Sequence, residues 1–253
     1  MKKFLILILF FNFSFGLDSR IENLIGQQKF NSYNKLIYKI FKNKQYNVYE
    51  ILVNLKNNGL LDLFFNKARV IHTKFRFYGG DNVLNLKILN DSLISLGYYY
   101  FYFSQVDKVD DKFDVEIEFK SEHFIDPVSL IDEMKSRNCQ ILDVNRYQDI
   151  FSYNFDCSNG IIKSVKNLTS KNQRYINSKG VYWLKTENFK KIYIKTKKID
   201  YYHPSIWFYD EKLNLLNNIK INKKTQKIIL KIPKYCKYIK LQIIIVPRIL
   251  KEE

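Results

Sequence analysis

The run from Phe113 to Phe119 alternates apolar and acidic residues without a break. A period of two is the pattern of a strand that has one face in a core and the other in water. A helix with the same sequence would distribute its apolar residues around every side. The chain therefore contains at least one two-sided β-sheet, apolar on one face and acidic on the other.

A second run of period two, residues 71–77, has basic residues where the first run has acidic ones. Helical spacing follows over about 83–96, and again from Asp126 and Pro127, which are typical of a helix start. Strands are expected at about 98–103, 139–145 and 151–157. The order β-α-β-β-α-β plus an extra strand predicts a ferredoxin-like α/β domain over residues 68–158. Its first and third strands would be antiparallel neighbours, with an ion-pair ladder formed by His72, Lys74 and Arg76 on one strand and Asp114, Glu116 and Glu118 on the other.

Cys139 and Cys157 bound the last two of these strands. If the hairpin turn is centred on Gln148, the two cysteines lie directly opposite and can form a disulfide. That register leaves Leu142 opposite Asn154. A one-residue shift would place Leu142 opposite Phe155 and separate the cysteines, so the pattern leaves both registers open.

Residues 17–67 have helical periodicity instead. One apolar stripe consists of Tyr33, Leu36, Ile37, Ile40 and Phe41. Asn47 and Glu50 have capping-box spacing ahead of the next helix, and Gly59 ends it. A short apolar turn of helix is expected over residues 60–65. We expect a small helical layer that covers the α/β domain.

The first segment resembles an export signal. Lys2 and Lys3 precede a continuous apolar run over residues 4–11, and Ser14 and Gly16 are small residues spaced as in a cleavage site. Residues 1–16 are predicted to be a signal peptide, which makes the mature chain a periplasmic protein. An uncleaved anchor is the alternative, although a spanning helix needs about 20 residues. No later segment is long and apolar enough to span, and export argues against nucleic acid as a partner.

Short strands recur across residues 159–253, separated by turns rich in Asn, Asp and Lys, and predict a C-terminal antiparallel β-sandwich. The fold class is therefore α+β. Trp207 and Tyr209 share one face of a strand, and Ile206 and Phe208 share the other. One of these pairs must be core. If Trp207 and Tyr209 are the outer pair, they could stack on sugar rings.

Charge divides the chain more sharply than composition does. The 253 residues have 42 basic and 25 acidic side chains, a net +17, but residues 69–158 hold 10 basic and 15 acidic groups whereas residues 159–253 hold 22 and 6. A general drift toward lysine codons would not reverse the sign between neighbouring regions. The lysines that alternate with apolar residues are predicted to form one partner-binding surface: Lys191, Lys195, Lys227, Lys231 and Lys240. A solvated lysine surface without a partner is the alternative.

No catalytic or metal-binding motif is present. The three histidines are far apart in sequence, and there is no HExxH, CxxC, phosphate loop or nucleophile elbow. The Gly79-Gly80-Asp81-Asn82 run has the composition of a strand-to-helix turn with an N-cap. We therefore expect neither an enzyme nor a cofactor.

Three runs carry a family resemblance: residues 58–65, residues 95–100 and residues 205–210. In these the chain resembles periplasmic accessory and scaffold proteins of the polar flagellar motor in epsilon-class bacteria, the paralysed-flagellum class. The resemblance implies a non-enzymatic scaffold or adaptor that docks other periplasmic proteins, with self-association left open. A module that binds glycans or anionic polymers of the cell envelope is the alternative.

Overall fold

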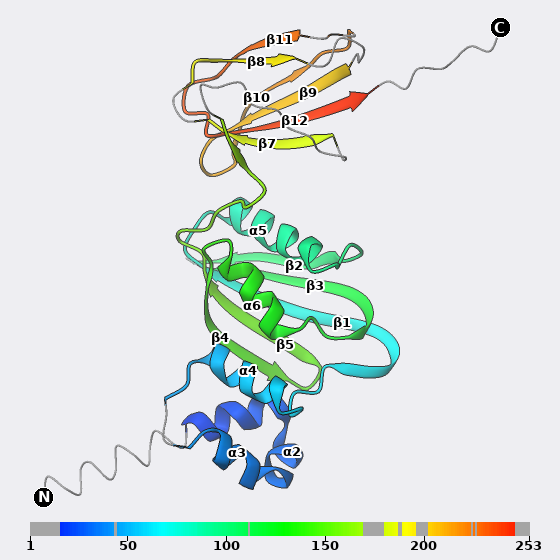
Figure 1. Ribbon diagram of the computed structural model, residues 1–253, viewed down its shortest axis with the longest axis vertical. Coiled ribbons are helices and arrows are strands. Elements are labelled where there is room, and N and C mark those ends of the chain that lie inside the picture. The colour runs from blue at the N-terminus through cyan, green and yellow to red at the C-terminus, as the bar shows by residue number, and fades with distance from the viewer. Residues whose placement is uncertain are drawn as a thin grey trace, which may run out of the picture. The chain divides into compact units, whose positions relative to one another are not determined.

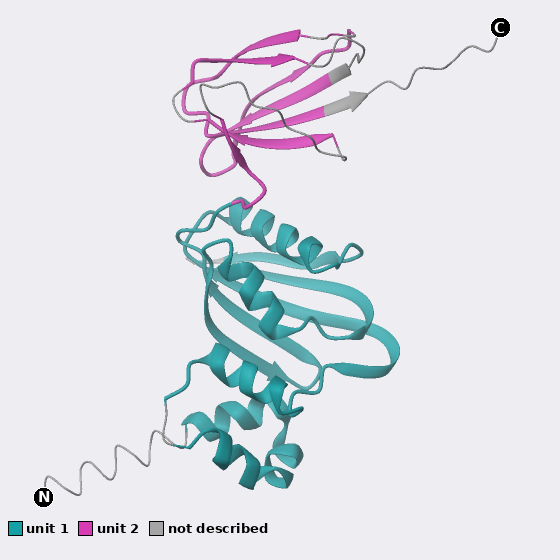
Figure 2. Cartoon of the chain, in the orientation of Figure 1, with its two compact units in different colours: residues 1–161 teal, residues 162–253 magenta. Residues whose placement is uncertain are grey.

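The computed structural model describes residues 16–42, 45–110, 112–168, 180–186, 189–195, 202–223, 225 and 227–245. The predicted signal peptide lies outside these residues except for Gly16. The chain divides into two compact units, residues 1–161 and residues 162–253 (Figure 2). The helical region predicted over 17–67 is thus part of unit 1, and the second boundary lies three residues beyond the predicted 158.

Unit 1 begins with four short helices. Residues 16–25 are helical, followed by α2 (Gln27–Ser32), α3 (Asn34–Ile40) and α4 (Val48–Asn57). The predicted capping box of Asn47 and Glu50 is present at the start of α4. The helix expected over residues 60–65 is wrong, because β1 already begins at Phe64. The strand predicted over residues 71–77 is longer at its N-terminal end, where aromatic residues such as Phe64 and Phe65 favour the extended conformation.

A five-stranded sheet with the order β2-β3-β1-β5-β4 forms the body of unit 1 (Figure 1). Two helices, α5 (Asn82–Ser95) and α6 (Pro127–Lys135), cover one face of it. The strands are β1 (Phe64–Tyr78), β2 (Tyr102–Val109), β3 (Lys112–His123), β4 (Gln140–Tyr147) and β5 (Ile150–Asp156). The aromatic run from Tyr98, predicted as strand, is extended only from Tyr102 onward.

The sheet order departs from the ferredoxin-like arrangement at one position. That arrangement would place the strand after α6 beside β1. Here β4 lies at the sheet edge, and β5 returns to pair with β1 in parallel. Phe151, Tyr153 and Phe155 of β5 are each at most 1% exposed, whereas β4 buries Val144 alone. The more apolar strand of the hairpin takes the inner position because more of its surface leaves water there.

A disulfide joins Cys139 to Cys157, with 4.4 Å between their Cα atoms. Both registers considered for the hairpin occur in it. Ile141 pairs with Phe155, as the bridge requires, but Val144 pairs with Tyr153, one residue out of step. A β-bulge at Leu142 absorbs the difference, and Leu142 is 49% exposed. The bulge therefore permits the covalent bond and the apolar pairing together.

Arg146 fastens the helical layer to the edge of the sheet. Its backbone N–H donates to Asn23 Oδ1 at 2.8 Å, and its Nη1 donates to the carbonyl oxygens of Asp62 at 3.1 Å and Leu24 at 3.4 Å. Burial lowers the pKa of this guanidinium, which lies over the ring of Phe124. A second connection is the ion pair of Lys56 with the α6 cap Asp126.

Unit 2 has two sheets that share one core. The larger has the order β10-β9-β12-β7-β6, and the smaller pairs β11 with β8. Inward side chains of both, such as Phe208 and Leu230, belong to one buried cluster. The strands are β6 (Lys166–Asn167), β7 (Val181–Lys185), β8 (Lys191–Lys195), β9 (Tyr202–Tyr209), β10 (Leu215–Lys220), β11 (Lys227–Lys231) and β12 (Tyr238–Ile245). Pairing is antiparallel except between β6 and β7. With the helices of unit 1, this makes the chain α+β.

Candidate functional site

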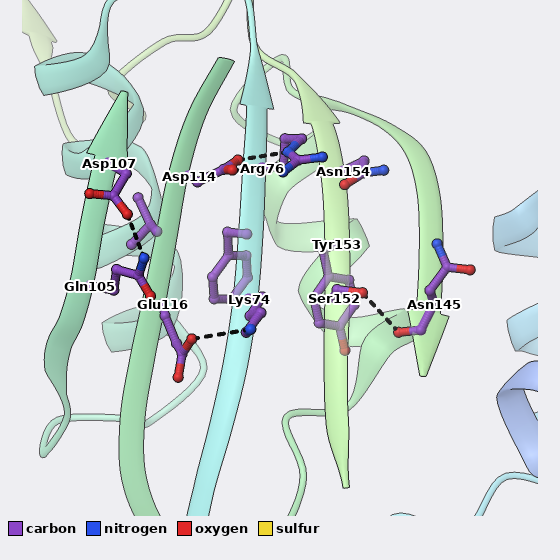
Figure 3. A pocket seen from close by; sticks show the side chains of 12 residues that line it. Lys74, Arg76, Gln105, Asp107, Asp114, Glu116, Asn145, Ser152, Tyr153 and Asn154 are labelled. Carbon is purple, nitrogen blue, oxygen red and sulfur yellow. Dashed lines mark hydrogen bonds and ion pairs between the residues drawn. The ribbon is translucent and has the colours of Figure 1, made fainter. Parts of the chain in front are cut away.

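The uncovered face of the unit 1 sheet has the predicted ion-pair ladder. β1 and β3 are antiparallel, with Lys74 opposite Glu116 and Arg76 opposite Asp114. Arg76 binds both oxygens of Asp114 at 2.7 Å, and Lys74 Nζ lies 3.5 Å from Glu116 Oε2 (Figure 3). His72 Nδ1 contacts the other oxygen of Glu116 at 2.8 Å. The ladder prediction is confirmed.

The ladder lines a hollow of about 390 Å³ whose other walls are polar side chains such as Asn145, Ser152 and Asn154. Its charged groups are largely paired with one another, which leaves little for a ligand. The hydrogen bonds from Arg76 lower the pKa of Asp114, although burial opposes them. A general acid needs its pKa raised toward neutrality, so this pair is suited to fixing strand register.

The Gly79-Gly80 run is a turn, as predicted. Both glycines have positive φ, and a Cβ at Gly80 would lie 2.7 Å from the carbonyl oxygen of Cys157. Asp81 then caps α5 by accepting from the N–H of Val83. The glycines are required by backbone conformation and close packing, not by a phosphate or calcium ion.

Four of the five predicted lysines lie together on the outer side of the β8–β11 ribbon. Lys191 is directly opposite Lys231, and Lys195 is directly opposite Lys227. All four are exposed, whereas Ile192, Ile228 and Leu230 between them enter the core. No carboxylate among the described residues lies within ion-pair distance of any of the four. This arrangement is called the four-lysine face below.

Lys240 was predicted on the same surface, and this is wrong. It lies on β12 in the larger sheet, where its neighbours Ile239 and Leu241 are buried. Lys240 therefore points outward from the larger sheet, on the opposite side of the shared core from the four-lysine face. Period-two spacing identifies the outward residues of each strand, but it does not tell which sheet a strand joins.

Lys240 instead belongs to an aromatic cluster, the aromatic face. Its Nζ lies 5.2 Å from the ring centre of Trp207 and 5.9 Å from that of Trp183. Trp183 stacks on Tyr209 at 5.5 Å. Ile206 and Phe208 are fully buried, so Trp207 and Tyr209 are the outer pair of the two sequence alternatives. Trp183 lies on β7, a strand that the sequence pattern did not predict, so its position beside Tyr209 was not expected.

The sequence prediction also passed over Tyr193 and Ile229, which lie opposite each other at the centre of the four-lysine face. They are 67% and 55% exposed. The signal was present, since both occupy the same phase of the alternation as the lysines. An apolar residue at an outward position is easily assigned to the core from pattern alone.

No family model, curated protein or solved structure matched the chain. Within the described residues, no helix has the length and apolar character needed to cross a membrane. No three His, Cys, Asp or Glu side chains of that part of the chain are grouped as a metal site would require. The sites must therefore be judged on their own geometry.

Proposed function

We propose that the chain is an exported, non-enzymatic adaptor that docks an acidic partner through the four-lysine face of unit 2. We infer that unit 2 is a β-sandwich, since its two sheets enclose one core. Within it, the smaller sheet presents the docking surface, and unit 1 is a separate, internally neutralised body.

One observation carries this proposal: like charges lie directly opposite each other twice on one short ribbon. Opposed side chains on neighbouring strands have Cβ atoms about 5 Å apart, and like charges there are destabilising. Random drift toward lysine would not place both pairs in register on one face. An acidic partner removes the repulsion and gains from the field.

The carboxyl groups support the non-enzymatic part. Asp114, Asp126, Asp156 and Asp210 all have pKa values below the ordinary one. At Asp126, burial raises the pKa, but hydrogen bonds from Lys56 and Ser129 outweigh it. Such shifts move the groups away from the range where acid–base catalysis operates at neutral pH.

The test is a tagged pull-down from envelope extract at low and high salt. The variant Lys191→Glu/Lys195→Glu/Lys227→Glu/Lys231→Glu should lose the partners that the wild type captures, and high salt should release them. Lys166→Glu/Lys220→Glu, with both lysines exposed on the larger sheet, is the control. If neither the four-lysine variant nor high salt reduces capture, the lysines only make the surface soluble and do not bind the partner.

On the family resemblance, we propose further that this adaptor acts among periplasmic scaffold proteins of the polar flagellar motor. On that proposal, deletion of the gene impairs swimming without preventing flagellar assembly, and the captured partners include motor scaffold proteins. Normal swimming of the deletion strain would remove the motor from the proposal and leave the adaptor.

A second function is favoured by the aromatic face. Trp207 and Tyr209 lie outside the core, so their rings could stack on sugar rings. Lys240 adds a positive charge beside Trp207. Sedimentation with purified peptidoglycan distinguishes this function: Trp207→Ala should abolish co-sedimentation, whereas substitution of the four lysines should not.

A further inference from the structure

We propose that the four-lysine face, with Tyr193 and Ile229 at its centre, binds the surface of an anionic lipid bilayer. The inference rests on the proposed function, since it identifies the acidic partner. It joins two features that the charge argument alone does not use: the exposed apolar side chains, and their position between the lysines on the same side of the ribbon.

The outward side chains of the ribbon form two short rows. One row is Lys191, Tyr193 and Lys195 on β8, and the facing row is Lys231, Ile229 and Lys227 on β11. The apolar pair thus has a lysine pair on either side along the strands. All six side chains are exposed. They leave one side of a two-stranded sheet, so their tips can reach a flat surface together.

This arrangement matches what a bilayer surface offers. Lysines are attracted by the anionic headgroups, and Tyr is favoured where apolar and polar regions meet. Ile229 is then removed from water between the headgroups, as apolar residues of interfacial elements are. A discrete acidic protein would need matching carboxylates around an apolar socket, whereas a bilayer provides both everywhere on its surface.

Further lysines lie just beyond the strand ends. Lys190 precedes β8 and Lys234 follows β11, and the N–H of Ile232 donates to the carbonyl oxygen of Lys190 at 3.0 Å. Tyr235 is 76% exposed, with Lys234 Nζ 4.8 Å from its ring centre. Lys190, Lys234 and Tyr235 line one hollow together with Asp210 and Glu211, so the charge at this end is mixed and the four-lysine face itself carries the proposal.

Charge and apolar contact are both needed. A lysine near an anionic membrane strengthens binding by roughly fivefold, so one cross-strand pair contributes about 25-fold. That attraction is screened by salt. The contact of Tyr193 and Ile229 is not, so binding should have a salt-sensitive part and a salt-resistant part that belong to different side chains.

The experiment is co-sedimentation of the purified protein with phosphatidylcholine vesicles, with and without phosphatidylglycerol, at low and physiological salt. Lys191→Ser/Lys231→Ser should weaken binding to the anionic vesicles about 25-fold. Lys166→Ser/Lys220→Ser removes the same charge from the larger sheet, where Lys166 lies on β6 and Lys220 on β10, and should have a much smaller effect. Tyr193→Ser/Ile229→Ser should remove the salt-resistant part. All variants have the same N-terminal segment, so any binding by that segment is common to all of them. Differences between variants therefore measure the contribution of the four-lysine face.

Tryptophan fluorescence shows whether each variant is folded, since Trp183 and Trp207 are the only tryptophans and both lie in unit 2. Equal binding of the wild type with and without phosphatidylglycerol would overturn the inference, and this result does not depend on whether any variant folds. Equal losses in the two lysine variants would also overturn it. If vesicles fail to bind but the lysines still capture an acidic protein from envelope extract, the bilayer is wrong and the adaptor stands. If both assays fail, both proposals fall.

Discussion

Two antiparallel strand pairs in this chain use charge in opposite ways. Between β1 and β3, the three basic side chains of the ladder, His72, Lys74 and Arg76, each lie opposite an acidic one. Between β8 and β11, lysine lies opposite lysine at both ends. The backbone geometry is the same and the outward positions are equally regular. The first pair thus satisfies its charges within the protein, whereas the second sets like charges against each other.

The difference separates the roles of the two units. An opposite-charge pair on an exposed strand contributes only about 0.2–1 kcal/mol, but a slip of one residue would place the charged side chains of one strand opposite apolar side chains of the other, so the alternation fixes the register. The lysine ribbon gains nothing from its own arrangement. Stability is the function of the first pattern, and recognition is the function we propose for the second.

The largest effect is expected from removing the disulfide, which lies in unit 1 and has no counterpart among the described residues of unit 2. Its two cysteines are 18 residues apart, and Cys139→Ser/Cys157→Ser should destabilise unit 1 by about 3 kcal/mol. Hydrogen exchange of β4 and β5 amides measures this loss, while tryptophan fluorescence should show unit 2 unfolding as before. Cys236→Ser, at the unbridged cysteine, is the control. Equal destabilisation of both units would show that they are not independent.

A charge reversal in the ladder would set like charges opposite each other on β1 and β3, as they are on β8 and β11. Asp114→Lys places lysine opposite Arg76 and should cost about 1 kcal/mol, the loss of one pair and the gain of a like pair. Denaturant unfolding of unit 1 followed by hydrogen exchange is the measurement. Glu122→Lys, an equal change near the end of β3, should cost much less. A similar cost at both positions would mean that net charge, and not the cross-strand pair, matters.

The ladder was predictable because its register follows from two local patterns that agree: strands 71–77 and 113–119 each alternate, and their signs are complementary. The disulfide was predictable only as one of two registers, because the bulge at Leu142 satisfies both and no local pattern announces a bulge. The position of Lys240 was not predictable, because membership of a sheet depends on packing between distant strands. Tyr193 and Ile229 lay in the right phase but had no property that distinguished them from core residues.

The reverse change should make the ribbon resemble the ladder. Lys195→Glu and Lys231→Glu each convert a like pair into an opposite pair, and each should stabilise unit 2 by about 0.5 kcal/mol. Tryptophan fluorescence in denaturant measures the gain. The same variants should bind the acidic partner less well, a trade of function for stability. Lys220→Glu, outside the ribbon, should do neither. A ribbon that loses stability on acquiring opposite charges would contradict the comparison.

The smallest effect is a difference in acid sensitivity. The hydrogen bonds from Arg76 lower the folded-state pKa of Asp114 below its ordinary 3.8. A lowered pKa stabilises the fold above the ordinary value, and that stabilisation is lost as pH falls through the folded value. The side chain of Asp114 is 31% exposed, so solvent screens the pair and the contribution is small. The stability difference between wild type and Asp114→Asn should therefore be constant from pH 7 to about 5 and shrink below about 4. The difference between wild type and Lys227→Gln should not change over this range, since lysine stays protonated throughout. A wild-type advantage over Asp114→Asn that persists unchanged at low pH would mean that the carboxylate's charge does not stabilise the ladder.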